Sequence, residues 1–289
     1  MIKSVPHLVE EMGKQQYIVD TELATAIYLS LILQKPLLVE GEPGCGKTEI
    51  SKILANIVST DLIRLQCYEG IDANQALYEW NYPKQLLAIR MSEGHPDVKL
   101  GSEIFSDEYL LKRPLLSSIM RESNSPPPVL LIDEIDRADE EFEGLLLEFL
   151  SDFQISIPER GTIKAKDPPI VIITSNRTRD LSDALRRRCI YAYVGYPSLE
   201  KEFSIVKMKV PELGSNLSKQ ICSFMQNVRN MPTILKKPGV SETLDWARAL
   251  LSLDIDQITE QSVRDTISCI VKTSEDKKRL GSELNKVLK

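Results

Sequence analysis

The stretch "PLLVEGEPGCGKTEISKILANIV", residues 36–58, carries the strongest structural signal in this chain. It begins with a short apolar run, passes through a loop that contains Gly41, Gly44 and Gly46, and ends in residues whose apolar positions recur every three or four places. A short apolar run before a glycine-rich turn is typical of a buried strand, and the later periodicity predicts an amphipathic helix. We therefore expect a strand, a tight loop and a helix in direct succession.

The loop carries the pattern Gly41-x4-Gly46-Lys47-Thr48, which in this strand–loop–helix context predicts a phosphate-binding loop. Glycines let successive backbone N–H groups converge on phosphate oxygens, and the helix N-terminus adds favourable partial charge. We expect Lys47 to act on the β- and γ-phosphates of ATP and the Thr48 hydroxyl to bind Mg²⁺. The predicted nucleotide-binding residues of the loop are Gly41, Glu42, Pro43, Gly44, Cys45, Gly46, Lys47, Thr48 and Glu49.

Four further apolar runs, separated by helical patterns, predict the rest of a sheet. The five predicted strands are 36–40, 62–66, 129–133, 170–174 and 190–194. Short runs that are apolar throughout suit a parallel sheet covered on both faces, so we expect a doubly wound α/β fold. Residues 1–197 would form this nucleotide-binding core, with an insertion around 67–127, and helical patterns in 198–289 predict a small all-α lid domain.

The segment "VLLIDE", residues 129–134, places two acids at the carboxyl end of a predicted strand, where ligands bind in this class of fold. Asp133 is expected to hold Mg²⁺, and Glu134 to polarise an attacking water as a general base. The alternative is a pair of solvated acids ahead of the helix that starts near Asp139. The phosphate-binding loop upstream favours the catalytic interpretation.

Two later segments supply further candidates. After a predicted β-hairpin, which contains Phe153, Ile155, Ile157 and a turn at Gly161, the strand "IVIITSN" ends at Asn176, whose amide could orient water against the γ-phosphate. An ordinary loop residue is the alternative. The triplet Arg186–Arg188 precedes the last predicted strand. A solvated basic turn is one explanation, and a cation supplied to the nucleotide of a neighbouring subunit is the other.

The ordered set "GEPGCGKT", "LLIDEIDRA", the hairpin, "ITSN" and "LRRRC" resembles an AAA+ ATPase of the MoxR type. The segments 65–90 and 175–197 resemble the CoxD-like branch, which is linked to carbon monoxide dehydrogenase maturation. The resemblance implies a Walker A motif at Gly41–Thr48, a Walker B motif at Asp133 and Glu134, and sensor 1 at Asn176. It implies Arg188 as the arginine finger, with Arg187 as second choice and Arg186 at the subunit interface.

The same resemblance assigns several other positions. Arg137 matches a family arginine that faces the neighbouring subunit, and residues 67–92 match an insertion that contacts partners. Ile18 lies where the family cradles adenine, although a plain core role is equally open. At the sensor 2 position, where the family commonly carries an arginine, this chain has Thr243 within "GVSET". Coupling between lid closure and hydrolysis is therefore in question.

The resemblance implies a Mg²⁺-dependent ATPase that assembles into a homo-hexameric ring and remodels a client protein. A von Willebrand A domain protein would be its partner, and chaperone-like maturation of a molybdenum hydroxylase metal centre its task. One alternative is an ATP-binding assembly switch with negligible hydrolysis. A nucleic-acid motor is another, because fold does not fix function, and a P-loop kinase fits the paired acids poorly.

Composition bounds these alternatives. The 289 residues carry a net charge of −6, which argues against nucleic acid as a partner. The most apolar stretch, 24–39, is interrupted by Gln34 and Lys35, and residues 1–10 lack the apolar core of a signal peptide, so we expect no membrane span and a cytoplasmic location.

The five cysteines form no CxxC pair, which argues against disulfides and zinc. Cys45 has no evident histidine partner and is interpreted as a small filler.

Overall fold

The computed structural model describes residues 2–92, 103–120 and 126–288, which divide into two compact units. The sheet unit contains Thr25–Glu40 and Thr48–Ala192, and the helical unit contains Lys3–Ala24, Gly41–Lys47 and Tyr193–Lys289. The predicted phosphate loop, Gly41–Lys47, thus belongs to the same compact unit as the C-terminal helices. The domain boundary expected after residue 197 stays a prediction.

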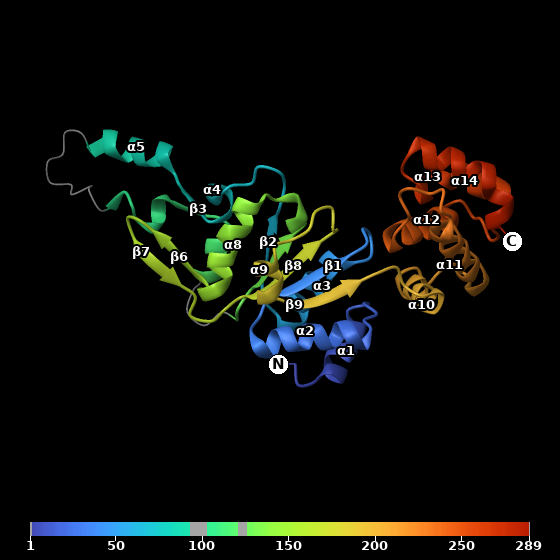
Figure 1. The fold of residues 1–289 in the computed structure, drawn as a ribbon, viewed down its shortest axis with the longest axis horizontal. Helices are drawn as coiled ribbons and strands as arrows, with labels where there is room; N and C mark the ends of the chain where they lie inside the picture. The colour runs from blue at the N-terminus through green and yellow to red at the C-terminus, as the bar shows by residue number, and fades with distance from the viewer. Residues whose placement is uncertain (1, 93–102, 121–125, 289) are drawn as a thin grey trace. The chain divides into compact units, whose positions relative to one another are not determined.

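The sheet has five strands in the order β2-β5-β8-β1-β9, flanked by helices (Figure 1). Their bounds are β1 Leu37–Gly41, β2 Leu62–Gln66, β5 Val129–Asp133, β8 Ile170–Ser175 and β9 Ile190–Val194. The pairs β2–β5, β5–β8 and β1–β8 are all parallel. The expected doubly wound α/β class, followed by C-terminal helices, is confirmed. Because parallel strands end at one edge, the sheet brings Gln66, Asp133 and Ser175 together there.

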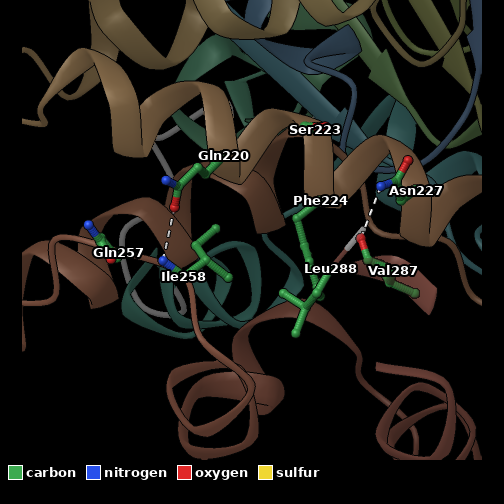
Figure 2. Close-up of a pocket in the computed structure, with 8 residues that line it drawn as sticks. All are labelled: Gln220, Ser223, Phe224, Asn227, Gln257, Ile258, Val287 and Leu288. Atoms are coloured by element: carbon green, nitrogen blue, oxygen red, sulfur yellow. Dashed lines mark hydrogen bonds between the residues drawn. The ribbon is translucent and has the colours of Figure 1, made fainter. Parts of the chain in front are cut away.

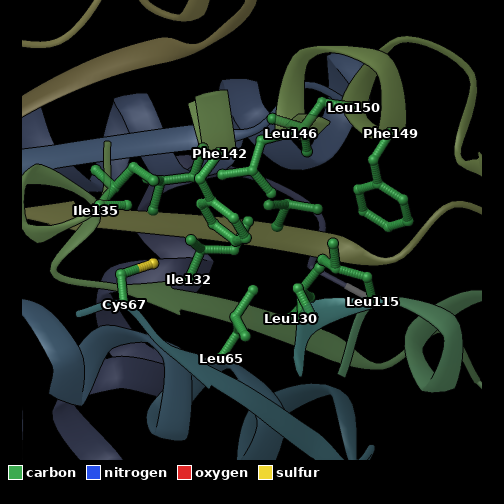
Figure 3. Close-up of a cluster of buried hydrophobic side chains, with 14 of the residues drawn as sticks. Leu65, Cys67, Leu115, Leu130, Ile132, Ile135, Phe142, Leu146, Phe149 and Leu150 are labelled. Atoms are coloured by element: carbon green, nitrogen blue, oxygen red, sulfur yellow. The ribbon is translucent and has the colours of Figure 1, made fainter. Parts of the chain in front are cut away.

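One face of the sheet packs against helices α7 (Pro114–Ile119) and α8 (Glu140–Asp152). Leu130 and Ile132 of β5 are buried in this cluster together with Phe142 and Leu146 of α8 (Figure 3). Leu131, which alternation directs to the opposite face, is equally buried. A strand buried on both faces explains the continuous apolar run, and it fixes the position of the acid that ends β5.

Helix α3 (Lys47–Val58) follows the glycine loop, and α2 (Thr21–Leu33) precedes β1. The predicted hairpin is present as β6 (Gln154–Ile157) and β7 (Gly161–Lys164), paired antiparallel. Gly161 has φ +80°, a left-handed conformation that suits glycine at the turn.

The predicted insertion has its own small elements. They are α4 (Ala73–Ala76), β3 (Tyr78–Trp80), α5 (Tyr82–Ser92), the 3₁₀ turn η1 (Asp107–Tyr109), β4 (Leu110–Lys112) and α7. Strands β3 and β4 pair antiparallel, and Trp80 packs edge-on against Phe105 with ring centroids 5.3 Å apart. Helix α5 projects from the rest of the sheet unit (Figure 1) and exposes Leu86, Leu87 and Met91. Residues 93–102 and 121–125 of the insertion lie outside the described residues.

The helical unit contains six helices within its described residues: α1 Val5–Lys14, α10 Leu199–Lys209, α11 Ser215–Asn230, α12 Val240–Ser252, α13 Glu260–Ile270 and α14 Ser274–Val287. Five of these six, α10 to α14, lie within residues 198–289, where the sequence showed helical patterns. Trp246 is fully buried at the centre, and its indole N–H donates to Thr266 Oγ1 at 2.8 Å. No helix in the part of the chain that the structure describes is both long and apolar enough to cross a bilayer.

Candidate active site

The glycine loop contains two glycines whose backbone is left-handed. Gly44 and Gly46 have φ values of +72° and +84°, in the left-handed region that favours glycine. A Cβ on Gly44 would come within 2.6 Å of Ser241 Oγ, and the Ser241 N–H donates to the Gly44 carbonyl at 3.1 Å. The start of α12 therefore lies against the loop, and close packing also excludes a side chain at Gly44.

Lys47, which ends the loop, is buried, with 6% of its surface exposed. Its Nζ donates to the Gly41 and Glu42 carbonyls at 2.9 and 2.8 Å. Cys45 is buried within the same loop, and burial raises the pKa of its thiol to about 11. A thiol with so high a pKa is a poor nucleophile at neutral pH, as expected for a filler.

At the carboxyl edge of the sheet, Asp133 is buried and its two carboxylate oxygens have different partners. Oδ1 accepts hydrogen bonds from the Thr48 hydroxyl at 3.1 Å and the Thr174 hydroxyl at 2.5 Å. Oδ2 lies 2.6 Å from Arg64 Nη2 of β2. The structure thus brings together the two residues predicted to bind Mg²⁺, and their oxygens are ligands of the kind that Mg²⁺ prefers.

Glu134 stands directly after β5 in a left-handed conformation, with φ +56° and ψ +51°. Its N–H donates to the Thr174 hydroxyl at 2.9 Å, which holds this uncommon backbone in place. Its carboxylate accepts from Asn176 Nδ2 at 3.3 Å and from Gln66 Nε2 at 3.4 Å, with Arg137 Nε 3.8 Å away. The predicted base and the predicted sensor amide are therefore in contact.

The structure adds residues that the sequence patterns did not single out. Asp136, buried in the turn after β5, accepts hydrogen bonds from the Asn176 and Thr178 N–H groups at 3.1 and 2.9 Å, and from the Thr178 hydroxyl at 2.6 Å. Burial raises the pKa of Asp136, but these hydrogen bonds outweigh it and hold the pKa below its ordinary value. Gln66 and Thr174 also belong to the site, and their place as polar residues at the ends of predicted strands is the signal that could have revealed them.

The three arginines of α9 (Asp183–Arg188) have different surroundings. Arg186 turns inward and pairs with the buried Glu40 at 3.1 Å. Arg188 is exposed, and its Nε and Nη1 donate to Ser151 Oγ and the Ala184 carbonyl at 3.2 and 3.3 Å. Arg187 is exposed and makes no polar contact with the described residues. Two of the three guanidinium groups therefore face solvent.

Thr243, at the predicted sensor 2 position, is fully buried in α12. Its hydroxyl donates to Glu202 Oε1 at 2.6 Å and accepts from Arg229 Nη2 at 3.0 Å. Glu202 and Arg229 form a bidentate ion pair at 2.6 and 2.7 Å and are themselves buried. This position thus belongs to the interior of the helical unit, whereas Arg248 is exposed and pairs with Asp245 at 3.6 Å.

Ile18, the predicted adenine contact, is half-buried in the segment between α1 and α2. The hydroxyl of the preceding residue, Tyr17, donates to the Gly46 carbonyl at 3.4 Å. This segment therefore lies beside the glycine loop. Glu49, the last of the predicted nucleotide-binding residues, lies in the first turn of α3 and pairs with Lys52 at 3.0 Å.

A cavity of about 330 Å³ lies in the helical unit (Figure 2), lined by Gln220, Ser223, Phe224, Asn227, Gln257, Ile258, Val287 and Leu288. Gln220 accepts from the Ile258 N–H at 3.0 Å, and Asn227 donates to the Val287 carbonyl at 3.0 Å. These two side-chain amides tie α11 to the segment before α13 and to the end of α14. Because these eight described residues include no charged side chain, they do not make a phosphate site.

The chain is similar to known proteins over most of its length. The chain is 27% identical over 263 residues to an uncharacterized protein of Staphylococcus aureus strain USA300, which covers 88% of this chain and 90% of that protein. A Staphylococcus haemolyticus protein, also uncharacterized, is 27% identical over 268 residues, covering 89% and 92%.

Among solved structures, one mutant form of RuvB from Thermotoga maritima has a TM-score of 0.51 at 18% identity, covering 92% of this chain and 72% of that chain. A second mutant form of RuvB has a TM-score of 0.50 at 19% identity, covering 95% and 74%. At such identities the likeness concerns the fold alone. The family model "ATPase family associated with various cellular activities (AAA)" matches residues 37–196. With its glycine loop, paired acids and parallel sheet, the chain belongs to the AAA family of ATPases.

Proposed function

We propose that this chain is a Mg²⁺-dependent ATPase that acts as a ring of the MoxR type. The observation that carries the proposal is the contact between Asp133 and Thr48, whose oxygens lie 3.1 Å apart at the carboxyl edge of the sheet. Thr48 follows Lys47 directly in the chain, so connectivity alone ties the phosphate loop to this oxygen pair. The residue types fit Mg²⁺, which when bound would offset charge on the phosphates.

In the proposed reaction, the loop N–H groups and Lys47 bind the phosphates, and Thr48 and Asp133 would hold the metal. Glu134 accepts a proton from the water that attacks the γ-phosphorus, while the bond from that phosphorus to the β–γ bridging oxygen breaks and ADP leaves. Asn176 orients the Glu134 carboxylate and the water. The contact at 3.3 Å and the hydrogen bonds of Asp136 to the Asn176 loop support these roles.

For the transition-state cation we favour Arg188, with Arg187 as second candidate, supplied by one subunit of a homo-hexamer to the nucleotide of the next. Exposure of both side chains supports this assignment, because only a solvent-facing guanidinium can reach another molecule. Arg186 is better explained as an anchor, since it pairs with the buried Glu40 of the same chain.

A protein client fits the charge and surface of the chain. The net charge of −6 disfavours nucleic acid, and α5 exposes Tyr82, Leu86, Leu87 and Met91 on a projecting helix. We propose that the client contacts this helix. A von Willebrand A domain partner and a molybdenum hydroxylase client, whose metal centre would be matured in a chaperone-like way, remain the specific proposals.

The second candidate is an ATP-binding switch that hydrolyses negligibly. One observation favours it: the predicted sensor 2 position carries Thr243, a neutral side chain that supplies no cation and is buried in a hydrogen-bond network. Glu134 and the exposed arginines favour hydrolysis instead.

The test measures ATP turnover against protein concentration, with particle mass and ATP binding recorded for each variant. We expect Glu134→Gln to lower turnover at least about 100-fold while it still binds ATP. Arg188→Ala should assemble normally yet lose about 100-fold or more in turnover. Arg264→Ala, which removes an exposed pair with Glu260 on α13, is the matched control and should change turnover less than about twofold. Wild-type turnover equal to that of Glu134→Gln would establish the switch.

A further inference from the structure

Asp133, the acid proposed to hold Mg²⁺, forms an ion pair with an arginine of the same chain. Arg64, in the middle of β2, places Nη2 2.6 Å from Asp133 Oδ2, while Oδ1 is taken by the Thr48 and Thr174 hydroxyls. A buried carboxylate without a counter-charge is costly, so this ion pair stabilises Asp133 when no metal is bound.

A guanidinium and a divalent cation compete for such a carboxylate, because like charges at this range repel. Arg64 can leave Asp133 when a metal binds. The Arg64 side chain is 55% exposed, whereas that of Asp133 is 4% exposed, so Arg64 can move into water without opening a buried cavity. Asp133 would keep its position while Mg²⁺ replaces the guanidinium beside it.

Arg64 also connects to the proposed base. The same Nη2 donates to Gln66 Oε1, and Gln66 Nε2 lies 3.4 Å from Glu134 Oε2. Departure of Arg64 would free Gln66 Oε1, which alters the polar surroundings of Glu134. The contacts therefore form a chain from the metal-binding acid, through Arg64 and Gln66, to the base.

We propose that Arg64 is a resident counter-ion of Asp133 that Mg²⁺ displaces, so that Arg64 sets how strongly nucleotide binding depends on Mg²⁺. The inference rests on the proposed function for the nucleotide site. Arg64 is a positioning residue here, because it acts on the metal through Asp133. Without metal it keeps Asp133 from repelling the phosphates, and with metal it is a competitor.

The test compares the dissociation constant of a fluorescent ATP analogue in EDTA with that at saturating Mg²⁺. Arg64→Gln should weaken binding in EDTA and lower the Mg²⁺ concentration at which binding is half-restored. The dissociation constant in EDTA divided by that in saturating Mg²⁺ should therefore rise about three- to tenfold. Arg64→Met should do the same, and Arg64→Lys should restore most of the wild-type ratio. A purely structural role would weaken binding under both conditions and leave the ratio unchanged, which would overturn the proposal.

Two controls make the outcome specific. Arg264→Gln removes an exposed arginine from another ion pair and should leave the ratio unchanged. In an Asp133→Asn background, Arg64→Gln should no longer raise the ratio, because its partner charge is absent. A wild type that binds the analogue without hydrolysing ATP refutes the proposed ATPase but not this inference, which the ratio still decides. A wild type that binds no analogue refutes both.

Discussion

The carboxylate of Asp136 holds the backbone of Asn176, accepting its N–H at 3.1 Å. Thr178, two residues further on, gives the same carboxylate its N–H at 2.9 Å and its hydroxyl at 2.6 Å. The turn after β5 thus fixes the loop after β8, and with it the amide that contacts Glu134. The proposed base and sensor are aligned by a residue that touches neither the nucleotide nor the metal in the proposed reaction.

Asp136→Asn should destabilise the protein by about 2–3 kcal/mol, because an amide cannot accept three hydrogen bonds with the strength of a carboxylate and places its own NH₂ among donors. The free energy of unfolding in urea measures this. Asp245→Asn, at an exposed pair with Arg248, is the matched control and should stay within about 0.5 kcal/mol. Equal stability of the two variants would contradict the structural role of Asp136.

The same residue predicts a pH dependence. Its pKa in the folded protein lies below the ordinary value of 3.8, so its stabilisation is complete above that value and is lost as the pH falls through the folded pKa. The difference in unfolding free energy between wild type and Asp136→Asn should therefore be constant near neutral pH and shrink below about pH 4. A difference that grows in acid would show that the sign is wrong.

Single truncations within the arginine triplet should show that Arg186 stabilises the fold and that Arg187 does not. Arg186→Ala leaves the buried Glu40 with the Tyr191 hydroxyl, 3.2 Å away, as its remaining side-chain partner among the described residues, and should cost about 2–4 kcal/mol. Arg187→Ala should change stability by less than about 0.5 kcal/mol, because its side chain is exposed. Urea unfolding of the two variants decides this, and equal losses would refute the inward role of Arg186.

Replacing Thr243 with the arginine that the MoxR type commonly carries at sensor 2 should destabilise the protein. Thr243 is fully buried between Glu202 and Arg229, so Thr243→Arg adds volume and charge to a closed network and should cost about 3 kcal/mol or more. Thr243→Ser keeps the hydroxyl and should cost about 1 kcal/mol or less. The unfolding midpoint of each variant checks this. A stable Thr243→Arg protein with faster ATP turnover would overturn the view that this position is structural.

The Cys45 thiol should react slowly. With its pKa raised by burial to about 11 from an ordinary 9.0, the thiolate fraction at pH 8 falls about 100-fold. Alkylation of the Cys45 peptide, followed by mass spectrometry, should be at least about 100-fold slower in the native protein than in urea. Labelling at equal rates would show that the loop opens readily.

Several features of the site follow from local pattern. The glycine loop, the five strands and the acids at 133 and 134 were predictable because strand burial and loop curvature depend on neighbouring residues. Arg64 and Asp136 were not, because each acts through a partner about 40 to 70 positions away, and nothing in "LIRLQ" or "DEIDR" specifies that partner.

Local sequence patterns are enough to indicate the fold class and the AAA family of this chain, and they predict a phosphate loop at Gly41–Thr48. Three further properties emerge from packing: which arginine of the triplet turns inward, that Thr243 is sealed within the helical unit, and that Arg64 lies on Asp133. Arg64 meets Asp133 because parallel pairing places β2 beside β5, although the two residues are far apart in the sequence. Thr243 is buried because Glu202 of α10 and Arg229 of α11 pack against α12. A linear pattern records which residues are present, and the packing of strands and helices determines which of them meet.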